Sequence, residues 1–275
     1  MTANNQEHLA HGRDALSFPM PPGFYNMDCM EALKSFPDKF FDLAIVDPPY
    51  GGGFVDQGGN TPPPKKFRVE GQSIGSVENE GASAASLTAI ISATRTGGAW
   101  FKKYAQQGGV FDAADISHWD IAPGPEYFNE LARVSKDQII WGGNYFDLPP
   151  TRCFVVWDKR QSEDFSMAMA EYAWTSFNQN AKVFYATPQG TAKEKRFHPT
   201  QKPIALYTWL LKRYAKPGFR ILDTHVGSAS SLVACHRAGL EYWGFEIDAE
   251  YYRLASERLE RVTAQVGLFD LVGPE

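Results

Sequence analysis

The chain has 275 residues, of which 43% are hydrophobic and 21% are charged, values typical of a folded globular protein. No apolar run approaches the roughly 20 residues that span a bilayer, and no basic region with an apolar core opens the sequence, so we expect a cytoplasmic protein with no membrane partner. Cys29, Cys153 and Cys235 lack CxxC spacing, which argues against a disulfide framework or a zinc cluster and predicts buried core thiols and no bound metal. The net charge of -5 argues against a general nucleic-acid binder, although a local basic face stays open.

The N-terminal half is interrupted by a long polar segment. Residues 1–22 are polar and end in several prolines, which predicts a flexible leader before a single domain at 23–275. Residues 41–47 are apolar and are followed at once by two prolines, so they predict a buried strand that ends abruptly. Residues 51–118 are rich in Gly and Pro and form an insertion in that domain, a candidate DNA-recognition segment or lid.

Helical and strand patterns alternate through the second half of the chain. Helices are predicted at 127–134, 203–214, 228–238 and 249–262, and strands at 138–141, 219–223 and 242–247. Two more strand candidates, 153–157 and 168–174, follow each other closely and suit an antiparallel edge. This order predicts an α/β fold, a doubly wound and mostly parallel sheet with an antiparallel edge strand.

The strongest functional signal is the sequence Asp47-Pro48-Pro49-Tyr50 at the end of the first strand, where open α/β sheets bind ligands. An exocyclic base amine is a poor nucleophile because its lone pair is delocalised into the ring. A carboxylate and a prolyl carbonyl that accept its two hydrogens favour a more nucleophilic nitrogen. Tyr50 offers a face on which an extruded base can stack. The competing interpretation is a plain proline turn after a strand.

A second signal is the strand, tight turn and helix at 221–232. Gly227 allows a ligand to approach the backbone, and the amides of the helix start attract a carboxylate or phosphate. Glu246 follows about 20 residues later, where such sheets bind ribose hydroxyls. The GxGxxG spacing is absent, which favours a nucleoside without a pyrophosphate. An ordinary βαβ unit with a surface glutamate is the alternative.

A third signal is the polar segment at 196–203, which reads Arg-Phe-His-Pro-Thr-Gln-Lys-Pro and opens a predicted helix. Thr200 is expected to cap that helix and leave its amides to a cofactor carboxylate, with Lys202 adding charge. Capping without any ligand role is the alternative interpretation.

These three segments in this order resemble the beta-class amino-specific DNA methyltransferases, which carry a DPPY motif, then an HPTQKP segment, then the cofactor turn. The resemblance spans about residues 25–252 and is greatest to small orphan methylases of prophages. It implies a Rossmann-like sheet, S-adenosyl-L-methionine as methyl donor, DNA as partner and adenine N6 as acceptor. Relatives that act on cytosine N4 more often begin the motif with Ser.

The resemblance also implies a role for each matching residue. Asp28 would accept from the cofactor adenine amine beside the Cys29 amide, although a plain loop carboxylate is the alternative, and Glu246 would bind the ribose. The implied catalytic loop is Asp47, Pro48, Pro49 and Tyr50. The implied cofactor site comprises Asp28, Cys29, His198, Thr200, Gln201, Lys202, Asp223, Thr224, His225, Gly227, Ser228, Glu246 and Asp248.

Two departures from the family pattern concern the cofactor turn and DNA recognition. The turn reads Asp-Thr-His-Val-Gly-Ser-Ala at 223–229 in place of Asp-Pro-Phe-x-Gly-Ser-Gly, so His225 either contacts a ligand or is simply hydrogen-bonded. The recognition region of many relatives is short here, at 174–198, and the insertion is the candidate to replace it. Its basic and aromatic side chains suit DNA, unless it is only a flexible cover; the predicted DNA contacts are Lys65, Lys66, Arg68, Lys102 and Lys103.

The sequence therefore predicts an enzyme that transfers a methyl group from S-adenosyl-L-methionine to N6 of a flipped adenine in DNA. Residues 141–145 are a candidate wall of the base pocket. The alternatives are methylation of cytosine N4, of RNA or of a protein amide, and a DNA- or cofactor-binding module without catalysis. A homodimer and a restriction partner stay open.

Overall fold

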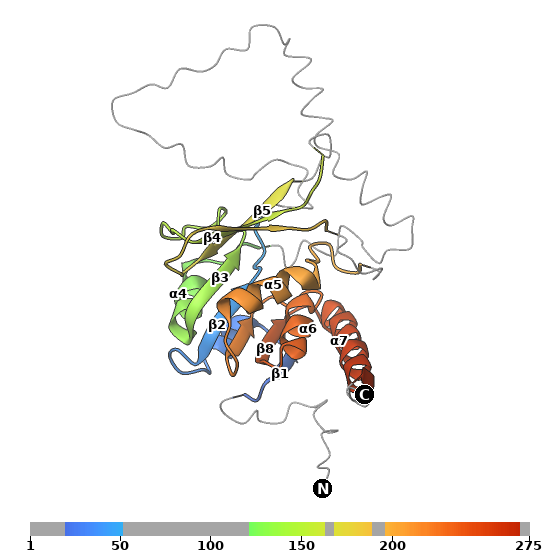
Figure 1. Cartoon of the computed structure of the whole chain (residues 1–275). Coiled ribbons are helices and arrows are strands. Elements are labelled where there is room, and N and C mark those ends of the chain that lie inside the picture. The colour runs from blue at the N-terminus through green and yellow to red at the C-terminus, as the bar shows by residue number, and fades with distance from the viewer. Residues whose placement is uncertain (1–19, 52–120, 163–167, 189–195, 270–275) are drawn as a thin grey trace, which may run out of the picture.

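A computed structural model describes residues 20–51, 121–162, 168–188 and 196–269 (Figure 1). The predicted leader, apart from its last residues, and the predicted insertion beyond Gly51 lie outside the described residues, so both stay predictions. Met20, at the end of that leader, is buried, and its carbonyl accepts a hydrogen bond from Trp243 Nε1 at 2.8 Å. The described domain therefore begins with a packed residue just before its first strand.

Eight strands form one sheet in the order β1-β8-β7-β2-β3-β5-β4-β6. Five of them, β1, β8, β7, β2 and β3, are parallel neighbours. The bounds are β1 Gly23–Asn26, β2 Phe41–Val46, β3 Ser135–Trp141, β4 Phe154–Asp158, β5 Ala170–Thr175, β6 Lys182–Tyr185, β7 Arg220–Asp223 and β8 Glu241–Glu246.

The antiparallel element lies inside the sheet and not at its edge. β5 runs antiparallel to both β3 and β4, while the edge strand β6 is parallel to β4. Two reversals restore the direction, so β4 and β6 end on the same side of the sheet as the five parallel strands. All seven of these strands therefore deliver their carboxyl ends to one edge of the molecule.

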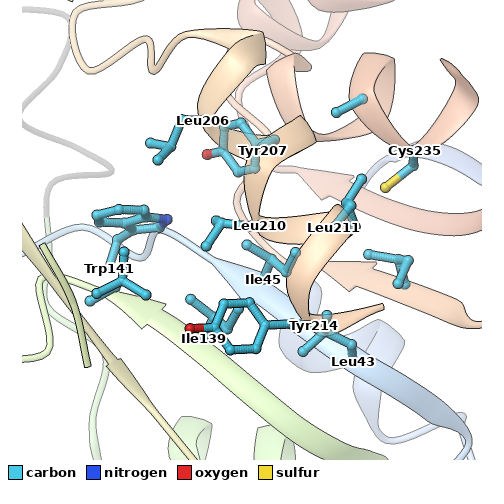
Figure 2. Close-up of a cluster of buried hydrophobic side chains, with 14 of the residues drawn as sticks. Leu43, Ile45, Ile139, Trp141, Leu206, Tyr207, Leu210, Leu211, Tyr214 and Cys235 are labelled. Carbon is cyan, nitrogen blue, oxygen red and sulfur yellow. The ribbon is translucent and has the colours of Figure 1, made fainter. Parts of the chain in front are cut away.

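Helices cover both faces of the sheet. Consecutive residues of β2 and β3 are apolar and buried, so both faces of these strands have to be shielded from water. Leu43 and Ile45 pack with α5 (Ile204–Tyr214) and α6 (Ser230–Arg237), as Figure 2 shows for α5. The intervening Ala44 and Val46 pack on the other face, with α1 (Cys29–Leu33) and α4 (Pro125–Val134).

The last helix, α7 (Ala249–Phe269), packs beside α6 and near the β1 and β8 end of the sheet (Figure 1). The predicted doubly wound α/β fold is confirmed, and so is each helix and strand predicted after residue 118, to within a few residues apart from the longer α7. Among the described residues, no helix combines the length and the apolar character that crossing a membrane requires.

The core prediction concerns Ile45, which is 1% exposed and lies two residues before the proline motif. We expect Ile45→Ala to lower the free energy of unfolding by about 2–4 kcal/mol, because it removes a packed side chain from a layer that cannot close over the gap. Val183→Ala on β6, where the side chain is 44% exposed, should cost less than about 1 kcal/mol. Urea denaturation of both variants measures the difference, and equal losses would contradict this location of the core.

Candidate active site

The proline motif lies at the point where the sheet changes direction. β2 and β7 are neighbours, but the chain continues from β2 toward β3 and from β7 toward β8, on opposite sides. Asp47 follows β2 and Asp223 ends β7, so both carboxyl groups lie at this edge of the sheet. A doubly wound sheet binds its ligands at such a switch point.

Both oxygens of the Asp47 carboxylate are held by side chains of the protein. Tyr50 donates its hydroxyl hydrogen to Oδ1 at 2.7 Å, and the Lys202 ammonium binds Oδ2. Burial, together with the nearby charge of Asp47, raises the pKa of Tyr50 well above its ordinary value, so the phenol stays a donor at neutral pH. The carboxylate is thereby fixed in orientation while 13% of its side chain remains exposed.

The Tyr50 ring is held by the segment after β3 that was predicted as a base-pocket wall. Gly142 has φ +67°, and a Cβ at this position would lie 2.1 Å from Tyr50 Cε1, so only glycine allows the ring to approach so closely. Tyr145 stacks on Tyr50 with the ring centroids 4.8 Å apart, and it is 61% exposed. The predicted wall therefore adjoins the catalytic loop.

Lys202 lies between two carboxylates, one of which the sequence did not reveal. Its Nζ is 3.1 Å from Glu171 Oε2 on β5, an ion pair rather than a well-aligned hydrogen bond, and Lys159 Nζ is 2.7 Å from Glu171 Oε1. Burial alone would lower the pKa of Lys202, but the charges of Asp47 and Glu171 outweigh burial and raise that pKa. Lys202 therefore binds the Asp47 carboxylate, and its predicted contact with the cofactor stays a prediction.

The turn after β7 has the features of a nucleoside site. Glu246 accepts hydrogen bonds from the Gly227 amide at 2.8 Å and the Asp248 amide at 3.0 Å, which fix its carboxylate at the end of β8. Each carboxylate oxygen can accept further hydrogen bonds, so Glu246 is able to accept from ribose hydroxyls. Gly227 has φ +53°, and a Cβ at this position would lie 3.1 Å from the His198 ring, so His198 of the HPTQKP segment lies close to the turn.

Thr224 and His225, which depart from the family pattern of this turn, belong to a hydrogen-bonded network. Thr224 Oγ1 lies 2.6 Å from the Tyr127 hydroxyl and 2.9 Å from His225 Nδ1, and the His225 ring packs edge-on against Tyr127. His225 is thus hydrogen-bonded within the fold. The Asp223 carboxylate accepts from the His225 amide at 3.0 Å and from Ser231 Oγ, and burial raises its pKa to about 7.

One side chain from α7 supports the start of α6. Arg258 of α7 is buried and donates to the Ser228 carbonyl at 2.6 Å and to Ser230 Oγ at 2.9 Å. Ala229 has φ +59°, the left-handed conformation that the usual glycine of this turn adopts without strain. Ser228 Oγ lies 3.1 Å from Ser230 Oγ, so Ser228 is also bound within the turn.

The expectation that Thr200 caps α5 is wrong. The helix begins at Ile204 with Pro203 as its N-cap, and no side chain caps it. Thr200 Oγ1 instead lies 3.2 Å from His198 Nδ1, and Gln201 Oε1 accepts from the Phe197 amide at 3.3 Å. Residues 197–201 form hydrogen bonds with one another ahead of Pro203, and the helix therefore begins after Pro203 and not at Thr200.

Asp28 and Cys29 follow β1, the strand that pairs with β8 and its Glu246, and their predicted contact with the cofactor stays a prediction. Asp28 is exposed and is the N-cap of α1, since its Oδ1 accepts from the Met30 amide at 2.8 Å. The register pairs Asn26 of β1 with Glu246 of β8. The cap leaves the second Asp28 oxygen open to a ligand amine, so the structural and ligand roles are compatible.

The predicted DNA contacts at Lys65, Lys66, Arg68, Lys102 and Lys103 lie outside the described residues and stay predictions. Within the described ranges, no group of three or more His, Cys, Asp or Glu side chains is arranged to hold a metal ion. Cys29, Cys153 and Cys235 are buried and free, as expected of core thiols.

The pH dependence of stability tests the His225 network. Burial lowers the pKa of His225 to about 4, so neutral His225 contributes stability that is complete above pH 6.5 and is lost as the pH falls toward 4. We expect His225→Asn to make the fall in unfolding free energy between pH 6.5 and 4.5 shallower by up to about 1 kcal/mol per pH unit. Urea denaturation at several pH values measures the slope, and an unchanged slope would contradict the buried, neutral imidazole.

A family model of DNA methylases matches residues 41–257 of the chain. YubD of Escherichia coli (strain K12), a protein named as a methylase, is 36% identical over 265 residues, which cover 87% of this chain and 90% of YubD. The fold is similar to that of TTHA0409 from Thermus thermophilus, named as a DNA modification methylase and solved with S-adenosyl-L-methionine, at 15% identity, TM-score 0.43, and coverage of 87% of this chain and 95% of that one.

A further similar structure is PvuII DNA methyltransferase, which is cytosine-N4-specific, at 11% identity, TM-score 0.49, and coverage of 90% of this chain and 96% of that one. The family model spans most of the chain, and it includes both the proline motif and the cofactor turn. The chain therefore belongs to the family of DNA methylases that modify the N6 or N4 amino groups of bases.

Proposed function

We propose that this protein methylates N6 of adenine in DNA with S-adenosyl-L-methionine as the donor. The observation that carries the proposal is the Asp47 carboxylate, which lies at the sheet's switch point, partly exposed and fixed by Tyr50 and Lys202. Family membership supports the DNA substrate, and the aspartate at the start of the motif favours adenine over cytosine.

The chemistry of the cofactor site fits this donor. Glu246 supplies a carboxylate that accepts from ribose hydroxyls, and Asp28 has a second oxygen that can accept from the adenine amine. The turn at Gly227 leaves room for the ligand to approach the amides that begin α6. When bound there, S-adenosyl-L-methionine would supply a methyl group already activated on a positively charged sulfur. The protein then has to position the acceptor and does little covalent chemistry itself.

The residues of the catalytic loop provide that positioning. Asp47 accepts one hydrogen of the base amine and the Pro48 carbonyl accepts the other, which favours a nitrogen lone pair directed away from the ring. Asp47 also takes the proton that the amine loses after methylation. Tyr50, which Gly142 and Tyr145 hold in place, is the surface for the extruded base.

The identity of the methylated base tests the proposal. Purified protein is incubated with unmethylated genomic DNA and S-adenosyl-L-methionine, and the digested nucleosides are measured by mass spectrometry. We expect N6-methyladenine. N4-methylcytosine would overturn the base assignment, and neither product with intact cofactor binding would favour the RNA, protein or binding-module alternatives.

The role of Asp47 is tested by Asp47→Ala, which we expect to lower the methyl-transfer rate at least about 100-fold because the amine loses its carboxylate acceptor. Affinity for S-adenosyl-L-homocysteine, the product, whose sulfur is uncharged, should change less than about twofold, since Lys202 keeps Glu171 as a partner.

The matched control is Asp38→Ala, which removes a carboxylate whose side chain is 77% exposed and pairs with Arg133 ahead of β2. This variant should retain wild-type methyl transfer in the same assay. Equal loss of activity and of product affinity in Asp47→Ala would instead indicate a folding defect or a wrong role for Asp47.

A further inference from the structure

Four charged side chains form a line from the catalytic loop across the sheet edge, and we call them the Lys202 cluster. Its members are Asp47 after β2, Lys202 before α5, Glu171 on β5 and Lys159 after β4. The charges alternate along the line, and the two carboxylates cancel the two ammonium groups. Glu171 and Lys159 have no place in the family motifs that the sequence displays.

The cluster is poorly solvated, so each charge depends on its neighbours. The side chains of Lys202 and Lys159 are 3% and 8% exposed, and that of Glu171 is 24% exposed. A buried ammonium that loses one of two anionic partners moves toward the other, and a buried charge without any partner is strongly unfavourable. The position of Lys202, and through it that of Asp47, therefore depends on Glu171.

We propose that Glu171 is a positioning residue of the methyl-transfer site, which holds Asp47 through Lys202 and, with Lys159, keeps the cluster neutral beside a cationic methyl donor. The inference rests on the proposed function, because only a cationic donor makes the balance of charge matter. The acceptor amine bound to Asp47 has to meet the donor methyl group, so the sulfonium charge must come close to this end of the cluster.

The charge balance of the cluster can be tested by comparing the affinities of the protein for two nearly identical ligands. S-adenosyl-L-methionine carries a positive sulfonium. S-adenosyl-L-homocysteine lacks the methyl group, has an uncharged sulfur and is otherwise identical. The ammonium and carboxylate of the amino-acid part are common to both ligands, so a net charge on the cluster changes the ratio of the two affinities through the sulfonium charge. A packing defect would weaken both ligands together.

Isothermal titration calorimetry of the full chain with each ligand tests the inference. Glu171→Gln leaves the cluster positive and should lower the affinity for S-adenosyl-L-methionine relative to S-adenosyl-L-homocysteine by roughly threefold to tenfold. Lys159→Met leaves it negative and should shift the ratio in the opposite direction. The double variant restores neutrality and should return the wild-type ratio.

The rate of methyl transfer gives a second readout. We expect Glu171→Gln to lower the single-turnover rate about tenfold, because Lys202 then closes on Asp47, while Glu171→Asp retains most of the rate.

The role assigned to Glu171 would be overturned if the ratio of the two ligand affinities stays at the wild-type value in both single variants. It would also be overturned if the ratio moves in the same direction in both. If Glu171→Gln does not fold, the affinity ratio of Lys159→Met alone tests the charge balance of the cluster. A wild-type protein that binds neither ligand would overturn the proposed function itself, a result distinct from wild-type binding with unmoved ratios.

Discussion

The Lys202 ammonium lies between two carboxylates, one after β2 and one on β5, the two strands that flank β3, and these two ion pairs join Asp47 to Glu171. Asp47 belongs to the parallel half of the sheet and Glu171 to the antiparallel strand inside it. Because a buried charge must keep its partners, the segment before α5 is fixed against both. The same segment carries His198, whose ring lies close to Gly227, so it contacts both the proline motif and the turn after β7.

The sheet makes this convergence possible. Parallel strands deliver their carboxyl ends to one edge, and the switch between β2 and β7 brings both Asp47 and Asp223 to that edge. The altered cofactor turn keeps its shape through contacts within the fold. Thr224 and His225 bond to each other beside Tyr127, Ala229 takes the conformation usual for glycine, and Arg258 binds the start of α6.

The parts predicted from sequence are those that local pattern or a contiguous motif specifies. Strands 41–47 and 219–223 and the residues at their ends could be predicted because apolar runs and turns are local signals. Short elements such as β1, α1 and β6 lack that periodicity and were missed. Glu171 and Lys159 were missed because their roles depend on contacts with Lys202 across the sheet, and the Thr200 cap was wrong because hydrogen bonds within 197–201 delay the helix to Ile204.

A crystal structure of the protein with S-adenosyl-L-homocysteine tests the central claim most directly, that one sheet edge holds the cofactor against an Asp47 fixed by Lys202. The account predicts ribose hydroxyls on Glu246, the ligand carboxylate on the amides at the start of α6, the sulfur facing Asp47, and Lys202 still bound to Asp47 and Glu171. A ligand carboxylate bound to Lys202, with Asp47 turned away from the sulfur, would contradict it.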